Sequence, residues 1–252
     1  MQLNTNLIKS QNDITFISAA YYHNDHFDNN IIGLSTSNNR YTNYNINFYG
    51  KGAPWVSLYH TKIVDLLEIL ETKCHSVFVC YIDSADTFLN KELDENFIEG
   101  FRSLNCSILF NAETNCYPLE QFSLIDNSNS EFKYLNSGLF IGYTDKVIEV
   151  LKECIKYYET MPQTRKIGWG APNDQTFHWM AYLRDRLSFD SRIKLDHEHD
   201  LFLCIQGKQL TDFDYSQGYV THNNKRPYFF HCPGNNKITN YKDMMKRVGF
   251  TL

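Results

Sequence analysis

The sequence predicts an α/β fold with a mostly parallel central sheet, formed as a single domain over residues 1–252. Strand-like apolar runs alternate along the chain with stretches of helical periodicity, the pattern of parallel strands joined by right-handed helical crossovers. The run at residues 77–82 is apolar throughout, as expected of a strand buried on both faces. With 252 residues, 42% of them apolar, the chain is long enough for one large core.

The elements of the first half follow from two periodicities, alternation for strands and apolar residues three or four positions apart for helices. The strand around residues 44–48 is predicted from alternation alone, because Tyr44, Ile46 and Phe48 alternate with asparagines. The predicted strands lie at 14–20, around 44–48, 77–82 and 106–110, and the predicted helices lie at 56–70 and around Phe97 and Phe101.

The second half continues the alternation with shorter strands. Residues 119–133 are polar and predict a loop, whereas residues 146–158 place their apolar side chains on one side of a helix. The remaining predicted elements are strands at 138–142, 193–195, 202–205 and 228–230 and a helix at 174–183.

Composition excludes several classes of protein. The net charge of −5 carries no bulk basic excess, so a nucleic acid is not the expected partner. The N-terminus has no apolar signal core, and no stretch approaches the roughly 18 apolar residues of a membrane span. The seven cysteines are odd in number and form no Cys-x-x-Cys pair, which argues against a zinc ribbon and favours a reducing, cytoplasmic location.

Two acidic residues directly follow the fully apolar strand at 77–82. Asp83 and Asp86 would lie at the carboxyl end of a buried strand, where α/β sheets bind ligands. Carboxylates at this spacing can hold a hard divalent cation against a phosphate-bearing substrate. The alternative is a strand-end turn, in which Asp is common for its backbone hydrogen bonds.

A histidine ends the last predicted strand in the same way. His231 could ligate a borderline metal such as Mn²⁺ beside carboxylates. The turn at Pro233 and Gly234 and the ammonium of Lys237 could then clamp a diphosphate. The alternative is a surface turn with an incidental histidine.

Two polar segments add further candidates. Asn136, Ser137 and Gly138 would let the backbone approach a ligand closely, although a strand with a bulge is the alternative. Residues 173–175 place Asp174 and Gln175 at the start of an aromatic-rich helix, where an ordinary N-cap is the alternative.

In this order the segments resemble the glycosyltransferase domain of the procollagen lysyl hydroxylases, a UDP-sugar-dependent domain of the GT-A (Rossmann-like) fold, and related collagen-type glycosyltransferases of giant viruses. The resemblance is collinear from about residue 60 to 237. It is carried by residues 78–86, 110–118, 134–143, 174–177, 195–197 with Phe202 and 206–207, and 231–237.

The resemblance implies roles for individual residues. The implied Mn²⁺ ligands are Asp83, Asp86 and His231. The residues implied to line the UDP-sugar site are Lys62, Asp83, Ser84, Asn136, Ser137, Gly138, Gly234 and Lys237. The implied catalytic residues are Glu113, Asp174 and Gln175, with Cys116 and Asp196 on neighbouring motifs.

The chain also departs from the family pattern. The family has a run of acidic residues before the glutamine, whereas this chain has Asp174 alone, preceded by Asn173. Tyr117 stands where the family often has tryptophan, and Cys232 replaces a glycine. The metal and diphosphate parts therefore resemble the family more closely than the sugar and acceptor parts.

The candidate residues and the resemblance together imply a Mn²⁺-dependent transferase that moves a hexose from a UDP-sugar to a hydroxyl acceptor. The resemblance implies retention and favours glucose or galactose as the hexose. The acceptor would be a glycan or a hydroxylated protein side chain, and homodimerisation is left open. A viral protein would act in the host cytoplasm or the virion. A catalytically weakened UDP-sugar-binding module is the alternative; a metal-dependent phosphohydrolase would leave the segment Asn136–Gly138 unexplained.

Overall fold

The computed structural model describes residues 13–21, 45–51, 53–118, 128–162, 173–188, 191–233 and 237–251, without the side chains of 237–241. Within these ranges the chain forms the predicted α/β fold around a mostly parallel sheet. The strands of this sheet are β1 (Ile14–Ala19), β2 (Ile46–Tyr49), β3 (Phe78–Ile82), β5 (Ile108–Glu113), β6 (Tyr134–Tyr143) and β7 (Ile193–Asp196).

The order of the strands places their ends together. The sheet runs β2-β1-β3-β6-β5-β7, and β6 is antiparallel to β3 and β5 while the other adjacent pairs are parallel. The strands β1, β3 and β5 therefore end at one edge of the sheet, where β6 begins. Ligand sites of open α/β sheets lie at this edge.

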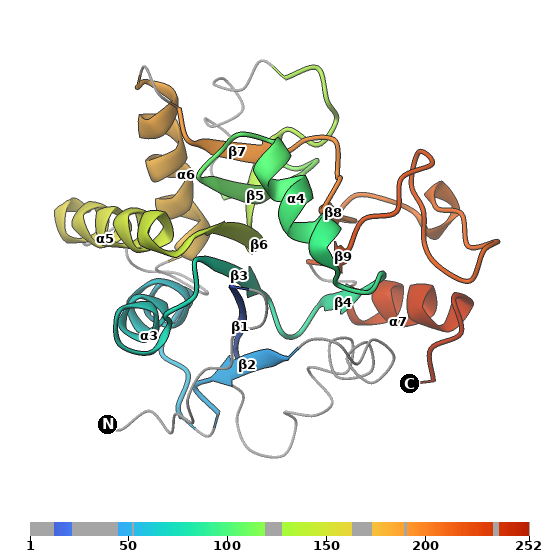
Figure 1. The fold of residues 1–252 in the computed structure, drawn as a ribbon, viewed down its shortest axis with the longest axis horizontal. Helices are drawn as coiled ribbons and strands as arrows, with labels where there is room; N and C mark the ends of the chain where they lie inside the picture. The colour runs from blue at the N-terminus through green and yellow to red at the C-terminus, as the bar shows by residue number, and fades with distance from the viewer. Residues whose placement is uncertain are drawn as a thin grey trace.

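Helices cover both faces of the sheet (Figure 1). The helical elements of the described residues are the π-helical turn η2 (His60–Val64), α3 (Asp65–Lys73), α4 (Glu95–Ser103), α5 (Thr144–Thr160), α6 (Asp174–Arg186), the 3-10 turn η5 (Leu210–Asp212) and α7 (Lys237–Arg247). In Figure 1, α3, α5 and α6 lie to one side of the sheet and α4 lies to the other.

Side-chain alternation along β3 divides the core in two. Phe78 and Cys80 pack with Phe97 of α4, whereas Val79 and Tyr81 pack in the cluster that contains the buried residues of α3, α5 and α6. Successive side chains of a strand point to opposite faces, so an uninterrupted apolar run is what a strand covered on both faces needs.

A second, smaller sheet carries the C-terminal part of the site. Its strands are β4 (Thr87–Leu89), β8 (Phe202–Cys204) and β9 (Phe229–His231), in the order β4-β9-β8. β4 pairs antiparallel with β9, with Thr87 opposite His231. The three residues of β4 are too few to show a periodicity, and the sequence analysis did not predict this strand.

Several elements differ from the prediction. The helix expected at 56–70 begins with the π-helical turn η2 and continues to Lys73, and α7 was not predicted. β5 was expected to end at Phe110, but it continues to Glu113 after a register shift against β6. Its last residues include Asn111 and Glu113, polar side chains that are buried beside β6.

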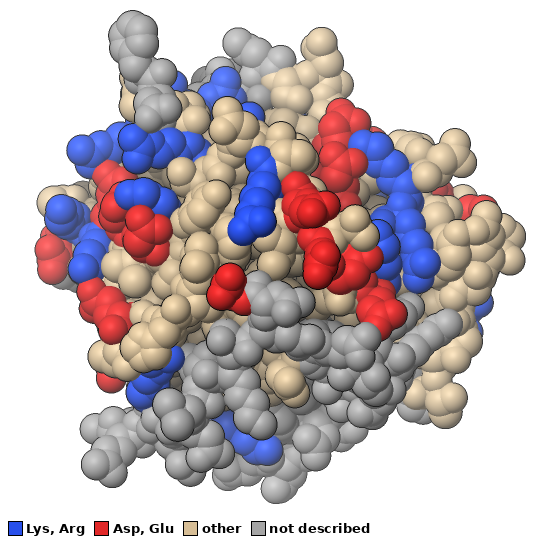
Figure 2. Space-filling view, in the orientation of Figure 1, with Lys and Arg blue, Asp and Glu red and all other residues tan. Residues whose placement is uncertain are grey.

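The surface charges are mixed in sign (Figure 2), and the cysteines form no disulfides. Figure 2 shows acidic and basic side chains interspersed over one face. All seven cysteines are free thiols. Among the described residues, no helix combines the length and the apolar character that a membrane crossing requires.

Candidate metal centre

Three potential metal ligands converge from two sheets. Asp83 follows β3, Asp86 precedes β4, and His231 ends β9. The Nε2 atom of His231 lies 3.6 Å from Oδ2 of Asp83 and 3.4 Å from Oδ1 of Asp86. One ligand atom from each residue lies within 4.8 Å of the others, which is close enough for all three to contact one ion.

Backbone pairing holds these residues in place. The amide of Cys232 donates to the carbonyl of Asp86 at 2.8 Å, extending the β4–β9 ladder past His231. The amide of Asp83 donates to the carbonyl of Gly138 in β6 at 2.8 Å. Each ligand is thus attached to a strand or strand end, and such elements hold a site more rigidly than a free loop.

The residues present fit a divalent cation. His231 is buried, and neither of its ring nitrogens has a hydrogen bond from the described residues. A buried imidazole without a hydrogen bond is costly, and coordination of a metal ion by one ring nitrogen would offset that cost. Gly138 lies against the cluster, since a Cβ there would be 2.2 Å from Cε1 of His231. Carboxylate oxygens with one imidazole suit Mn²⁺ among other divalent ions.

Lys62 reaches this cluster from the π-helical turn η2. Its Nζ lies 2.7 Å from both carboxylate oxygens of Asp83 and 3.9 Å from Oδ2 of Asp174. Burial lowers the pKa of Lys62, but Asp174 and Asp83 outweigh burial and hold that pKa above its ordinary value. The ammonium is therefore charged and compensates part of the acidic cluster.

Gln175 connects three elements around the cluster. Its Nε2 donates to Oε1 of Glu113 at 2.8 Å and to the carbonyl of Tyr117 at 2.9 Å. Its Oε1 accepts from the amide and the hydroxyl of Ser137 at 3.2 and 3.3 Å. Asn173 caps α6 by accepting from the amide of Gln175. These bonds fix the start of α6, and with it Asp174, against β5 and β6.

Glu113 is the buried acid of this network. Its Oε1 also accepts from Nδ2 of Asn136 at 3.2 Å, and Oδ1 of Asn136 accepts from the amide of Gly138. Burial raises the pKa of Glu113 to about 7, against the opposing hydrogen bonds from Gln175 and Asn136. Its Oε2 has no hydrogen-bond partner in the described part of the chain.

The raised pKa of Glu113 predicts a pH-dependent stability. Between its ordinary pKa of 4.5 and about 7, the folded state keeps a proton that the unfolded state has lost. The free energy of unfolding should therefore fall as pH rises through this window, by up to about 3 kcal/mol. Glu113→Gln keeps the accepting oxygen and removes the titration. The free energy of unfolding of the variant minus that of wild type, measured by urea unfolding, should be larger at pH 8 than at pH 5. An equal difference at the two pH values would contradict the raised pKa of Glu113.

Two further predicted residues, Ser84 and Asp196, make hydrogen bonds to the backbone. The Ser84 hydroxyl donates to the carbonyl of Ala19 at 2.7 Å and so ties β1 to the end of β3. The carboxylate of Asp196 accepts three backbone amides at residues 200–202, which suits a turn-forming role. Gly234 lies outside the described residues. Lys237 begins α7, but its side chain is also outside the described part.

Tyr81 lies beside the cluster although the sequence did not predict it as a site residue. Its hydroxyl donates to Oδ1 of Asp83 at 3.1 Å, and its ring packs beside Phe140 of β6. A signal was available, because residues two positions apart along a strand share a face and Tyr81 precedes Asp83 by two. The apolar run was treated as core, and the polar end of its tyrosine was overlooked.

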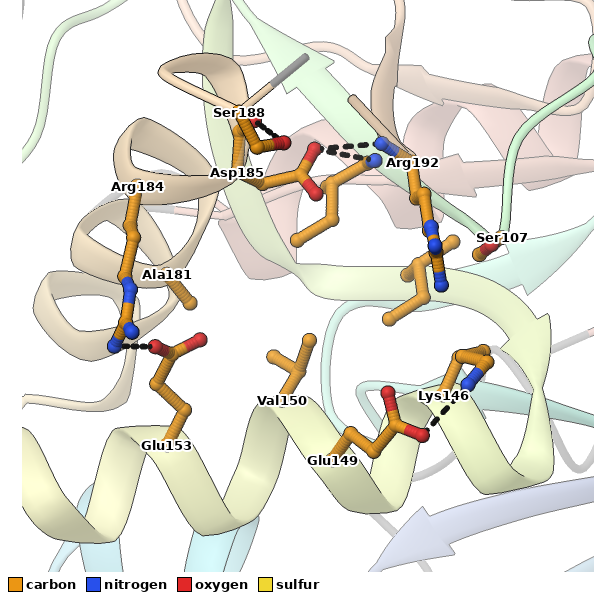
Figure 3. A pocket seen from close by; sticks show the side chains of 12 residues that line it. Ser107, Lys146, Glu149, Val150, Glu153, Ala181, Arg184, Asp185, Ser188 and Arg192 are labelled. Atoms are coloured by element: carbon orange, nitrogen blue, oxygen red, sulfur yellow. Dashed lines mark hydrogen bonds and ion pairs between the residues drawn. The ribbon is translucent and has the colours of Figure 1, made fainter. Parts of the chain in front are cut away.

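A hollow of about 460 Å³ lies far from this cluster, where β5 and β7 begin (Figure 3). Its charged side chains are largely engaged with one another. Arg184 pairs with Glu153, Lys146 lies 2.6 Å from Glu149, and Asp185 accepts the backbone amide of Arg192. None of the potential metal ligands lines it, so it is not the candidate site.

Comparison with curated proteins finds lysyl hydroxylase relatives. The chain is 28% identical over 151 residues to a procollagen-lysine,2-oxoglutarate 5-dioxygenase of Drosophila melanogaster, covering 56% of this chain and 19% of that protein. It is 30% identical over 150 residues to an uncharacterized protein of Acanthamoeba polyphaga mimivirus, covering 57% and 28%. It is 25% identical over 170 residues to a multifunctional procollagen lysine hydroxylase and glycosyltransferase of Caenorhabditis elegans, covering 63% and 21%. Each match spans less than a third of the relative's length.

The fold and the family agree with these relatives. A crystal structure of a glycosyltransferase involved in the glycosylation of the major capsid of PBCV-1 superposes with a TM-score of 0.55 at 12% identity, covering 92% of this chain and 98% of that one. At this identity the match concerns the fold. The family model of the PLOD GT domain matches residues 11–243, nearly the whole chain. The chain therefore belongs to the PLOD GT-domain family of glycosyltransferase domains.

Proposed function

We propose that this domain transfers a hexose, with glucose or galactose favoured, from a UDP-sugar to a hydroxyl acceptor with retention of configuration, using Mn²⁺. The observation that carries the proposal is the convergence of Asp83, Asp86 and His231, a buried histidine whose ring nitrogens accept or donate no hydrogen bond among the described residues. In a glycosyltransferase family, such a cluster at the ligand edge of the sheet is suited to a cation that faces a diphosphate. Retention and the choice of hexose rest on the family resemblance alone.

The proposed division of labour follows from position and charge. Asp83, Asp86 and His231 would hold the cation, which supplies Lewis-acid stabilisation of the departing UDP. Gly138 lets His231 and Asp83 lie close against β6, because a Cβ there would overlap both side chains. The Lys62 ammonium is near enough to the cluster to add positive charge close to the diphosphate.

Asp174 is the candidate for the sugar side of the site. It is buried at the start of α6, and its Oδ2 has no hydrogen bond within the described ranges. A carboxylate there could stabilise the positive charge that develops on the sugar or accept a hydrogen bond from the acceptor hydroxyl. Gln175 and Glu113 would orient it through the network they share with Ser137.

The acceptor is proposed from the relatives. One of them is named as a procollagen-lysine,2-oxoglutarate 5-dioxygenase and another as a multifunctional procollagen lysine hydroxylase and glycosyltransferase. A hydroxylated protein side chain is therefore the first acceptor to test, with a glycan as the second.

A panel of UDP-sugars tests the proposal. With Mn²⁺, UDP release should exceed the rate with EDTA at least about a hundredfold for one donor, since a cation that stabilises the leaving group contributes several kcal/mol. A hydroxylysine peptide should raise that rate further and gain one hexose by mass spectrometry. Binding of UDP-sugars without release, with or without acceptor, would contradict the transferase. That result would favour the binding module suggested by the single acid Asp174 at the start of α6.

A further inference from the structure

Asp83 belongs to the proposed cation site and also pairs with Lys62. Both of its carboxylate oxygens lie 2.7 Å from Nζ of Lys62, while Oδ2 is also 3.6 Å from Nε2 of His231. Lys62 is therefore paired with a residue that would ligate the cation. A cation arriving at Asp83 has to share this carboxylate with the ammonium or displace it.

Lys62 has a second anionic neighbour to which it could move. Oδ2 of Asp174 lies 3.9 Å from Nζ, is buried, and accepts no hydrogen bond from any described residue. The side chain of Lys62 is only 13% exposed, so the ammonium would not be released into solvent. Its flexible four-carbon stem would allow the short shift from one carboxylate to the other.

We propose that Lys62 is a built-in counter-ion that competes with the divalent cation for Asp83 and leaves it when an anionic donor arrives. The proposal rests on the cation site of the proposed function. When no cation is bound, Lys62 compensates one of the three carboxylates of Asp83, Asp86 and Asp174. A donor diphosphate would attract the ammonium away from Asp83, so the cation could then bind without displacing it.

Competition for Asp83 and long-range repulsion of the cation by Lys62 predict different effects of UDP on Mn²⁺ affinity. If Lys62 only repelled the cation, removing its charge would tighten cation binding equally with and without UDP. If Lys62 occupies Asp83 only in the absence of UDP, removing it tightens binding mainly in the absence of UDP. The factor by which UDP strengthens Mn²⁺ binding, which is the coupling between the two ligands, then becomes smaller.

The test is a Mn²⁺ titration of the whole chain, followed by electron paramagnetic resonance of free Mn²⁺, with and without saturating UDP. The variants are Lys62→Met, which removes the charge, and Lys62→Arg, which keeps it. Lys152→Met is the matched control, because Lys152 pairs with Glu71 on the surface and its loss changes the net charge equally. Circular dichroism melts verify that each variant is folded.

We expect Lys62→Met to bind Mn²⁺ about tenfold more tightly than wild type without UDP, with a coupling factor lower by a similar amount. Lys62→Arg and Lys152→Met should stay near wild type. Unchanged Mn²⁺ affinity in Lys62→Met, or tighter affinity with an unchanged coupling factor, would overturn the proposal.

Asp86→Asn separates this outcome from a failure of the cation site itself. If Asp86→Asn loses Mn²⁺ binding while Lys62→Met equals wild type, the cation site holds and only the counter-ion role is wrong. If Asp86→Asn binds Mn²⁺ like wild type, both the cation site and the counter-ion role are contradicted.

Discussion

Replacing Asp86 by asparagine should lower Mn²⁺-dependent UDP release by about a thousandfold or more. Changing a residue that merely supports a metal ligand typically lowers metal affinity or activity about 10- to 100-fold. Loss of a ligand carboxylate should lower activity further. Asp86 is 6% exposed and lies 3.4 Å from Nε2 of His231, so its charge acts within the cluster. The measurements are kcat/KM for UDP release and the Mn²⁺ dissociation constant.

Asparagine suits this test because it preserves the local backbone. The carbonyl of Asp86 accepts the amide of Cys232, and this main-chain bond does not depend on the side chain. Asp145→Asn is the matched control, since it removes the same charge from a side chain that is 69% exposed. Full Mn²⁺-dependent turnover in Asp86→Asn would show that the metal assignment is wrong.

Gly138→Ala should produce the second large effect, a loss of Mn²⁺ affinity of about 100-fold. The added Cβ would lie 2.2 Å from Cε1 of His231, 2.6 Å from its Nε2 and 2.8 Å from Oδ2 of Asp83. These distances are below contact, so His231 or Asp83 has to move. The β4–β9 ladder holds the backbone of His231, and Gly138 itself accepts the amide of Asp83. The ligands should therefore be pushed apart, and stability should fall by about 1–3 kcal/mol.

Gly142→Ala separates damage to the site from damage to the fold. Gly142 lies on the same strand, and its Cβ would come within 2.9 Å of Ile108 and Val147, both of them core residues. This variant should lose stability and keep its Mn²⁺ affinity. The measurements are Tm by differential scanning calorimetry and Mn²⁺ titration. Equal Mn²⁺ affinity in Gly138→Ala and Gly142→Ala would contradict the contact between Gly138 and the cluster.

The sequence predicted the alternating fold because burial leaves periodic traces. The run 77–82 became β3, and the helical spacings became α3, α4, α5 and α6 with ends shifted by a few residues. Strand direction leaves no such trace, and the antiparallel course of β6 was not foreseen. β4 is too short for a period, and the end of β5 was missed because Asn111 and Glu113 interrupt its apolar pattern.

The candidate site was predictable where its residues lie next to a strand end. Asp83 and Asp86 follow an apolar run, and His231 ends another, so each was visible as a candidate. Their convergence with Glu113, Asp174 and Lys62 was implied by the family resemblance. The ion pair between Lys62 and Asp83 was not foreseen, because it depends on the π-helical turn that aims the lysine at the end of β3.

The α/β class and the acidic pair at a buried strand end could be predicted from the residue pattern, and the family from the collinear resemblance. How the groups meet depends on the folded chain. The pairing of β4 with β9 sets His231 beside Asp86, and the close approach of Gly138 leaves space for no side chain. Burial raises the pKa of Glu113 to about 7. Periodicity records local burial, whereas the distances between charges and the desolvation of a carboxyl depend on segments that are remote along the chain.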